Sequence, residues 1–122
     1  MDLMGDYKDL IVFQKAYVLA MDIFEETKNF PTEEKFSLTD QIRRSSRSVC
    51  TCLLEAYRKK KYPSHFESKV TDSDRENSET GGWLDFSVAC KYIDPAVYHR
   101  FYFKYEEIGR LLNHMINNPL QY

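Results

Sequence analysis

Four long segments of helical periodicity, separated by prolines, constrain the fold of this chain more than any other feature of its sequence. In each segment apolar residues recur at steps of three and four, which is the pattern of one face of an α-helix. The residue before a proline disfavours helical backbone, so each proline is expected to mark a boundary. Long helices joined by short connections pack as antiparallel neighbours, so the sequence predicts an all-α, up-down-up-down four-helix bundle. The four prolines are Pro31, Pro63, Pro95 and Pro119.

Capping residues refine the expected boundaries. Residues Thr32–Lys35 are expected to form a short turn between the first two helices. Ser64, with Glu67 three residues later, has the form of a capping box that opens the third helix. Asp94 and Pro95 predict the start of the fourth helix, because an acidic N-cap and a proline at the first position both favour a helix there. The helices are expected to end near Phe30, Lys61, Ile93 and Asn117.

The periodicity also predicts which side chains face the core. The first helix should bury Leu10, Phe13, Tyr17, Ala20 and Phe24, with Ala16 and Ile23 at the edge of this stripe. The second should bury Leu38, Ile42, Ser45, Val49, Cys52 and Ala56. The third should bury Phe66, Val70, Ser73, Asn77, Thr80, Leu84 and Val88. The fourth should bury Val97, Phe101, Tyr105, Ile108, Leu112 and Met115. Gly81 and Gly82 weaken the third helix, so we expect close packing or a bend there, beside Trp83.

The composition is that of a single globular domain over residues 1–122. Apolar residues make up 43% and aromatic residues 15%, which is too rich for a disordered chain. No stretch approaches the ~20 apolar residues of a membrane-spanning helix. Residues Met1–Asp6 lack the basic and apolar regions of a signal peptide. An odd count of three cysteines is typical of a reducing compartment, so we expect a soluble cytoplasmic protein without membrane contact.

Charge is sorted along the chain by segment. Residues 32–62 hold a net charge of +4, whereas residues 1–31 and 63–93 each hold −3 and residues 94–122 hold none. The net charge of −2 argues against indiscriminate nucleic-acid binding but leaves room for a local basic face. Such sorting indicates that the helices present differently charged faces, either to one another or to a partner.

The end of the second helix is one candidate for nucleic-acid contact. Cations are favoured at a helix C-terminus, so the run can equally be an ordinary solvated helix end. The two tyrosines beside the run could stack on bases, which favours the nucleic-acid interpretation. The run comprises Arg58, Lys59, Lys60 and Lys61, and the tyrosines are Tyr57 and Tyr62.

Three arginines earlier in the same helix, Arg43, Arg44 and Arg47, could contact phosphate, because guanidinium groups match phosphate oxygens. A hairpin of the second and third helices turning near residues 61 and 62 would place Arg44 opposite Glu79 and Arg47 opposite Glu76. We therefore predict two structural ion pairs, Arg44–Glu79 and Arg47–Glu76. Arg43 has no such partner and is expected to join the nucleic-acid contact.

A metal-dependent hydrolase is the enzyme-class alternative. Di-iron bundles need Glu-x-x-His motifs, and no glutamate stands three residues before any of the three histidines. Glu76 and Glu79, together with Asp22 and Glu25, resemble the acidic clusters of helical nucleotide pyrophosphohydrolases, but the second acid-rich helix of such sites is missing. No Gly-rich phosphate loop or Ser-His-Asp arrangement can be assembled. We expect no enzymatic activity, no cofactor and no metal.

The last helix is unusually rich in aromatic residues. One bundle core needs a stripe of about 100°, and five aromatics in eight positions exceed it. We expect the surplus to form a second buried face between subunits; the alternative is an ordinary core with exposed tyrosines. The five are Tyr98, Phe101, Tyr102, Phe103 and Tyr105.

Three stretches together resemble a known family. They are Tyr7–Ala16 (YKDLIVFQKA), Phe30–Ser46 (FPTEEKFSLTDQIRRSS), and Glu76-x-x-Glu79 followed by Trp83-Leu84. The chain thereby resembles the bacterial four-helix-bundle family named for 23S rRNA intervening sequences, from about residue 7 to residue 117. One departure is clear, because Cys52-Leu53-Leu54-Glu55-Ala56 stands where the family usually has Asn-Ile-Ala-Glu-Gly.

The resemblance implies a four-helix bundle that assembles as a barrel-like homopentamer, as does the related accessory protein of diversity-generating retroelements. That relative binds nucleic acid and a reverse transcriptase through basic surface, and no enzymatic activity accompanies the fold. Two functions are therefore expected for the oligomer. The first is an RNA- or DNA-associated scaffold, and the alternative is a protein-interaction or structural oligomer without nucleic-acid contact.

Overall fold

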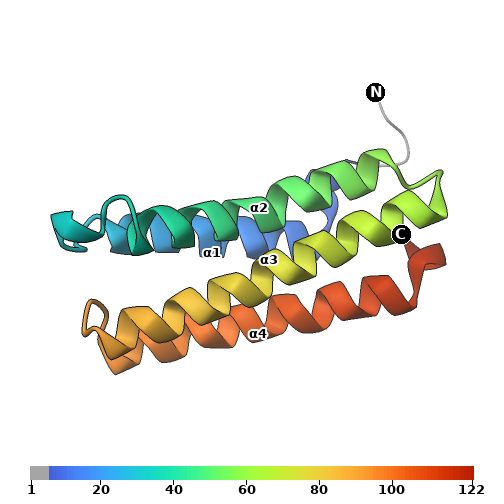
Figure 1. Cartoon of the computed structure of the whole chain (residues 1–122). Coiled ribbons are helices and arrows are strands. Elements are labelled where there is room, and N and C mark those ends of the chain that lie inside the picture. The colour runs from blue at the N-terminus through green and yellow to red at the C-terminus, as the bar shows by residue number, and fades with distance from the viewer. Residues whose placement is uncertain (1–5) are drawn as a thin grey trace.

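The computed structural model describes residues 6–122, which form four long α-helices and no strand (Figure 1). The chain runs up and down the bundle, so the predicted all-α, antiparallel four-helix bundle is confirmed. Most of the segment assessed for signal-peptide features, residues 1–5, lies outside the described residues. The helices are α1 (Ile11–Thr27), α2 (Leu38–Arg58), α3 (Pro63–Ala89) and α4 (Pro95–Asn117). Three short 3-10 turns accompany them: η1 (Tyr7–Asp9), η2 (Thr32–Glu34) and η3 (Pro119–Gln121).

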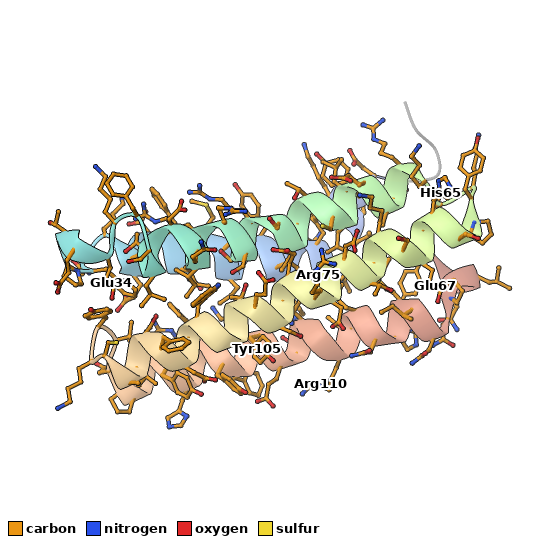
Figure 2. The ribbon with its side chains drawn as sticks, viewed as in Figure 1. Glu34, His65, Glu67, Arg75, Tyr105 and Arg110 are labelled. Atoms are coloured by element: carbon orange, nitrogen blue, oxygen red, sulfur yellow. The ribbon has the colours of Figure 1, made fainter. Side chains whose placement is uncertain are left out.

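The helices pack in a ring, with α1 on α2 and α4, and with α3 on the other faces of α2 and α4. The α2–α3 turn, beside His65, lies at the opposite end of the bundle from Glu34 (Figure 2). Each helix contributes an apolar stripe to one continuous core. Ile23, Ile42, Leu84 and Ile108, one from each helix, are almost completely buried within it.

The stripe predicted for the first helix was wrong by about one position. Phe13 and Phe24 are only half-buried and Tyr17 is exposed. The helix is apolar on nearly every side, so two neighbouring stripes satisfied the same periodicity. The structure selects the stripe that includes Ala16, Ala20 and Ile23 and whose full set is Val12, Ala16, Leu19, Ala20, Ile23 and Thr27.

The interface between α2 and α3 is made of small and polar side chains, close to the register expected from the hairpin. The hydroxyls of Ser45 and Thr80 are 2.8 Å apart, and the Ser73 hydroxyl donates to the Val49 carbonyl at 2.8 Å. Small residues allow the two backbones to approach, and the hydrogen bonds satisfy the polar groups that this approach buries. Leu53 is fully buried here, whereas Cys52, predicted for this seam, is only half-buried.

The helix boundaries follow local backbone chemistry. The Asp94 carboxylate accepts the Val97 N–H at 2.8 Å, so the predicted cap of the fourth helix is confirmed. The capping box predicted at Ser64 does not form, because α3 already begins at Pro63, whose fixed φ suits a first helical position. Helix α3 ends at Ala89, earlier than expected, because Lys91 adopts a left-handed conformation with a φ of 63°.

The aromatic residues of α4 are mostly accommodated within the bundle. Phe101 is buried, and Tyr98, Tyr102 and Tyr105 are half-buried with their rings packed in sequence, at centroid distances of 5.2 and 4.9 Å. Among these five aromatics only Phe103, which is 65% exposed, remains largely uncovered. The surplus that predicted a second buried face on α4 is therefore largely covered by contacts inside one chain.

Candidate nucleic-acid interface

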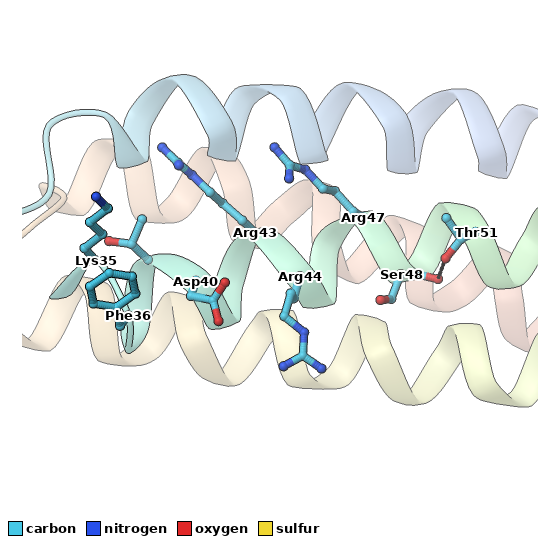
Figure 3. Close-up of a pocket in the computed structure, with 9 residues that line it drawn as sticks. Lys35, Phe36, Asp40, Arg43, Arg44, Arg47, Ser48 and Thr51 are labelled. Atoms are coloured by element: carbon cyan, nitrogen blue, oxygen red, sulfur yellow. Dashed lines mark hydrogen bonds between the residues drawn. The ribbon is translucent and has the colours of Figure 1, made fainter.

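The outer face of α2 and the turn before it carry a group of cations that we call the α2 shelf. Its cations are Lys35, Arg43, Arg44 and Arg47, and they line a surface hollow of about 450 Å³ in which Asp40 is the sole acid (Figure 3). The hydroxyls of Thr39, Ser48 and Thr51 complete the lining with the ring of Phe36. The group faces outward because the buried residues of α2 occupy the opposite side of the helix.

Arg43 is held in place by helix α1. Its Nε donates to the Thr27 hydroxyl at 2.8 Å, and its guanidinium lies 4.7 Å from the centre of the Phe24 ring. A second guanidinium, that of Arg47, lies 5.5 Å from the centre of the same ring. Phe24 therefore holds two cations close together, and the shelf has a fixed positive centre at the α1–α2 seam.

The two predicted ion pairs do not form. Within residues 6–122 no carboxylate lies within 4.0 Å of Arg44 or Arg47, so neither Arg44–Glu79 nor Arg47–Glu76 is an ion pair. Figure 3 shows Arg47 directed toward α1 and Arg44 directed toward α3. Position 47 follows the seam residue Ser45 by two residues, about 200° around the helix, so its side chain points away from α3.

The electrostatic field of Arg44 nevertheless reaches the acidic side of α3. Partial burial raises the pKa of Glu76, and the nearby Glu79 carboxylate raises it further, while Arg75 and Arg44 lower it. Glu76 has its own contact at 4.0 Å with Arg75 on the same helix. Arg44 thus stands between the shelf and the acids of α3 without being neutralised by a direct contact.

The run predicted at the end of α2 is a second, separate basic cluster. Arg58, Lys59 and Lys61 are exposed, and Lys60 is half-buried with its Nζ 4.1 Å from the centre of the Tyr57 ring. Tyr62 is exposed beside His65 at the start of α3. The run lies about 16 Å along the helix from Arg47, since each residue adds 1.5 Å. The structure places these residues as a solvated helix end and brings Arg43 together with Arg44 and Arg47 instead.

Sequence reasoning did not assign Lys35 and Phe36 to a site. Lys35 adjoins η2 and Phe36 follows it, both before α2 begins, so neither belonged to a periodic stripe. The phenyl ring of Phe36 is 86% exposed, and Lys35 Nζ lies 5.3 Å from its centre. The available signal was a phenylalanine two positions before the seam residue Leu38, where it could not reach the core.

Residues 6–122 give little support for a metal site, a hydrolase site or a membrane-spanning helix. Across residues 6–122 no three His, Cys, Asp or Glu side chains gather where they could hold a metal ion. The acids of the hydrolase alternative lie on diagonal helices, and Asp22 is paired with Lys104 of α4 at 2.7 Å. No helix within residues 6–122 has the length and apolar character needed to cross a membrane.

Comparison with known proteins places the chain in a family. The sequence profile of the 23S rRNA-intervening sequence protein family matches residues 8–114. The chain belongs to the 23S rRNA-intervening sequence protein family. Among solved structures, a Bacteroides thetaiotaomicron VPI-5482 protein of unknown function from the S23 ribosomal protein family is similar, with 29% identity and a TM-score of 0.81. That match covers 90% of this chain and 98% of the Bacteroides chain. A comparison with curated proteins gives no match.

Membership confirms the predicted family resemblance, and the likeness of the Bacteroides structure confirms the fold. Neither the family description nor that structure names an enzymatic activity. The function of this member of the 23S rRNA-intervening sequence protein family must therefore be argued from its own surface, on which the α2 shelf gathers four cations around one hollow.

Proposed function

We propose that this protein is a non-enzymatic scaffold that binds RNA or DNA through the α2 shelf and assembles with copies of itself. The observation that carries the proposal is the grouping of four cations in one hollow with a single acid, Asp40. Arginine forks match phosphate oxygens, and the bracing of Arg43 by Thr27 reduces the conformational entropy lost on binding.

The acidic charge of the rest of the protein limits where a polyanion can bind. The whole chain is acidic, with a net charge of −2, so polyanions are attracted to its basic clusters and not to its surface as a whole. The run of Arg58 to Lys61 begins at the last residue of α2 and continues into the turn after it, where it would provide a weaker second contact. Phosphate contacts of this kind position a nucleic acid without reading its sequence, so we propose a binder without strong sequence preference.

Self-assembly would multiply the shelf. Helix α1 packs its inward side against the core of the bundle. Its outward side leaves four apolar residues exposed, namely Ile11, Tyr17, Val18 and Met21. Contiguous exposed apolar surface of this kind marks an interface. We propose a closed homo-oligomer, with five copies as the family resemblance predicts, so that one shelf per subunit adds to the binding through multivalency.

A second candidate function is protein interaction without nucleic acid, with a partner protein in place of RNA or DNA. It is favoured by an apolar hollow of about 370 Å³ between α1 and α2, beside Arg47. The residues that line this hollow include Phe13, Tyr17, Met21 and Leu54.

Binding measured across salt concentrations tests the proposal. The affinity for a labelled 20-nucleotide RNA should fall by about 0.7 logarithmic units per contacted phosphate for each tenfold rise in salt. The triple variant K35Q/R44Q/R47Q should weaken binding and flatten this slope, because it removes three shelf cations while leaving Arg43 and its contacts intact. The matched variant K59Q/K60Q/K61Q loses the same charge from the helix end and should have the smaller effect.

Two results would contradict the proposal. Equal losses in the two triple variants would mean that net charge, and not the shelf, determines binding. No retention of RNA or DNA by the unmodified protein at low salt would leave the protein-interaction function in its place.

A further inference from the structure

The α2 shelf ends at an exposed aromatic surface whose role the phosphate contacts do not explain. The Phe36 ring lines the shelf hollow and also a neighbouring hollow of about 400 Å³ that reaches α3. Trp83 and Phe86 line that second hollow, and their ring centres are 5.8 Å apart. Phe86 is 59% exposed and Phe36 is 86% exposed, so two uncovered phenyl rings follow the cations along one surface.

These rings are presented by ordered backbone. In the turn that holds Phe36, the N–H of Lys35 donates to the Thr32 carbonyl at 3.0 Å and the N–H of Ser37 donates to the Glu34 carbonyl at 3.1 Å. Phe86 lies in the last turns of α3, where its carbonyl accepts the Cys90 N–H at 2.9 Å. Phe36 therefore stays in the solvent because the turn holds it there, with the Lys35 ammonium 5.3 Å from the centre of its ring.

The arrangement of cations beside exposed aromatic rings indicates which form of nucleic acid this surface binds. In a duplex the bases are stacked on one another and cannot reach a side-chain ring outside the grooves, whereas unpaired bases can turn outward and stack on aromatic rings. The hollow extends along about 18 Å of helix, from Thr39 to Thr51, and its cations are Lys35 before the helix and Arg43, Arg44 and Arg47 within it. A groove lined by cations and continued by an aromatic platform is the arrangement typical of single-strand binding.

We propose that the ligand of the α2 shelf is single-stranded RNA or DNA, with its phosphates along Lys35, Arg44 and Arg47 and its bases stacked on Phe36 and then Phe86. The inference rests on the proposed nucleic-acid function and specifies its ligand class. Phe36 and Phe86 are the specificity-determining residues for a single strand, while the cations provide affinity for any polyanion.

The test compares the affinity of the protein for a labelled 20-nucleotide RNA of mixed sequence with its affinity for the same RNA annealed to its complement, at constant salt. The unmodified protein should bind the single strand more tightly. Phe36→Ala should weaken single-strand binding by about fivefold to 150-fold, the range found when the aromatic side chain under one stacked base is removed, and Phe86→Ala should act in the same direction. Duplex affinity and the salt slope should stay unchanged, because no cation is removed. Phe36→Trp should retain or strengthen single-strand binding.

Phe103→Ala is the matched control, since Phe103 is also an exposed phenylalanine but lies on α4 outside both hollows. It should leave binding unchanged, and the mass of every variant in solution should equal that of the unmodified protein. Equal affinity for strand and duplex, with no effect of Phe36→Ala, would overturn this inference and leave the scaffold function intact. A changed mass for Phe36→Ala would assign the ring to a subunit contact and also overturn it. Absence of binding to either probe would overturn both.

Discussion

Residue 81 of α3 is a position that only glycine occupies without displacing a neighbour. A Cβ atom added to Gly81 would lie 2.5 Å from Cζ of Tyr105, well inside van der Waals contact. The same stretch is fixed by Asn77, whose Nδ2 donates to the Tyr105 carbonyl at 3.1 Å. The close packing expected from the two glycines is thus confirmed at Gly81, and its partner is Tyr105 of α4, at mid-bundle in Figure 2.

Alanine substitutions at the two adjacent glycines should separate packing from helix propensity. Gly81→Ala should lower the free energy of unfolding by about 1–3 kcal/mol, because it overpacks the α3–α4 interface. Gly82→Ala should leave that free energy unchanged or raise it by up to about 1 kcal/mol, because nothing lies within 4 Å of the added methyl and alanine favours the helix. Urea unfolding followed by circular dichroism measures both. Equal effects of the two substitutions would remove the Tyr105 contact as the cause.

Among the secondary-structure elements, η2 is held by one carboxylate that contacts three of its neighbours. Glu34 accepts hydrogen bonds from the Ser37 hydroxyl, from the Tyr92 hydroxyl at 2.9 Å and from the Leu38 N–H at 3.3 Å. These donors hold the pKa of Glu34 below its ordinary value of 4.5, with Ser37 contributing most. The same contact to Glu34 raises the pKa of Tyr92 to about 12. The turn before α2 is therefore tied to the α3–α4 turn at one end of the bundle.

The Glu34 contacts predict a pH dependence of stability. Because the folded-state pKa of Glu34 is depressed, its stabilising contribution is present above pH 4.5 and is lost as the pH falls through the lower folded-state value. Melting temperatures taken from about pH 6 to about pH 3 should fall in the unmodified protein and should fall less in Glu34→Gln. Glu33→Gln removes an exposed carboxylate from the same turn and serves as the control. A Glu34→Gln profile parallel to that of the unmodified protein would contradict the role of these contacts.

The helices differed in how far their faces could be predicted from the sequence. The faces of α2 and α3 followed from periodicity apart from Cys52, whose expected place in the core is taken by Leu53, because polar residues occupy the opposite sides of these helices. Leu10, which precedes α1, and the first three residues of the helix are all apolar, so periodicity alone could not separate two adjacent stripes. The hairpin register came close, as Ser45 and Thr80 show, but the direction of Arg47 depended on its angle around the helix.

The candidate site was only partly predictable for a related reason. Periodicity identifies buried positions, whereas a shelf is made by exposed side chains whose directions depend on neighbouring helices. Arg43 is positioned by Thr27 and Phe24 of α1, sixteen or more residues away in the sequence. Phe36 lies in a turn, where no repeating pattern distinguishes a functional ring from an incidental one.

At the scale of the whole molecule, the shelf cations lie mainly on α2, whereas the exposed apolar side chains of the proposed subunit interface lie on the adjacent helix α1. The shelf occupies the outward side of α2, and acids occupy α3, where Asp72, Glu76 and Glu79 lie close enough to affect one another. Helix α1 carries the exposed apolar side chains and also forms two ion pairs with α4, Lys15–Glu107 at 3.2 Å and Lys104–Asp22 at 2.7 Å. An isologous contact between shelves would bring like charges together, so a ring in which different faces meet is the assembly we propose.

The proposed ring depends on the exposed apolar side chains of α1. Light scattering at micromolar concentration should give about five times the mass of one chain for the unmodified protein. Val18 is 49% exposed on α1, so Val18→Glu should lower this mass by placing a charge in an apolar contact that must exclude water. Leu120→Glu adds the same charge at a residue that is 95% exposed in η3 and should leave the mass unchanged. A monomeric unmodified protein would contradict the assembly. A full-mass Val18→Glu variant would instead show that the interface lies away from this side of α1.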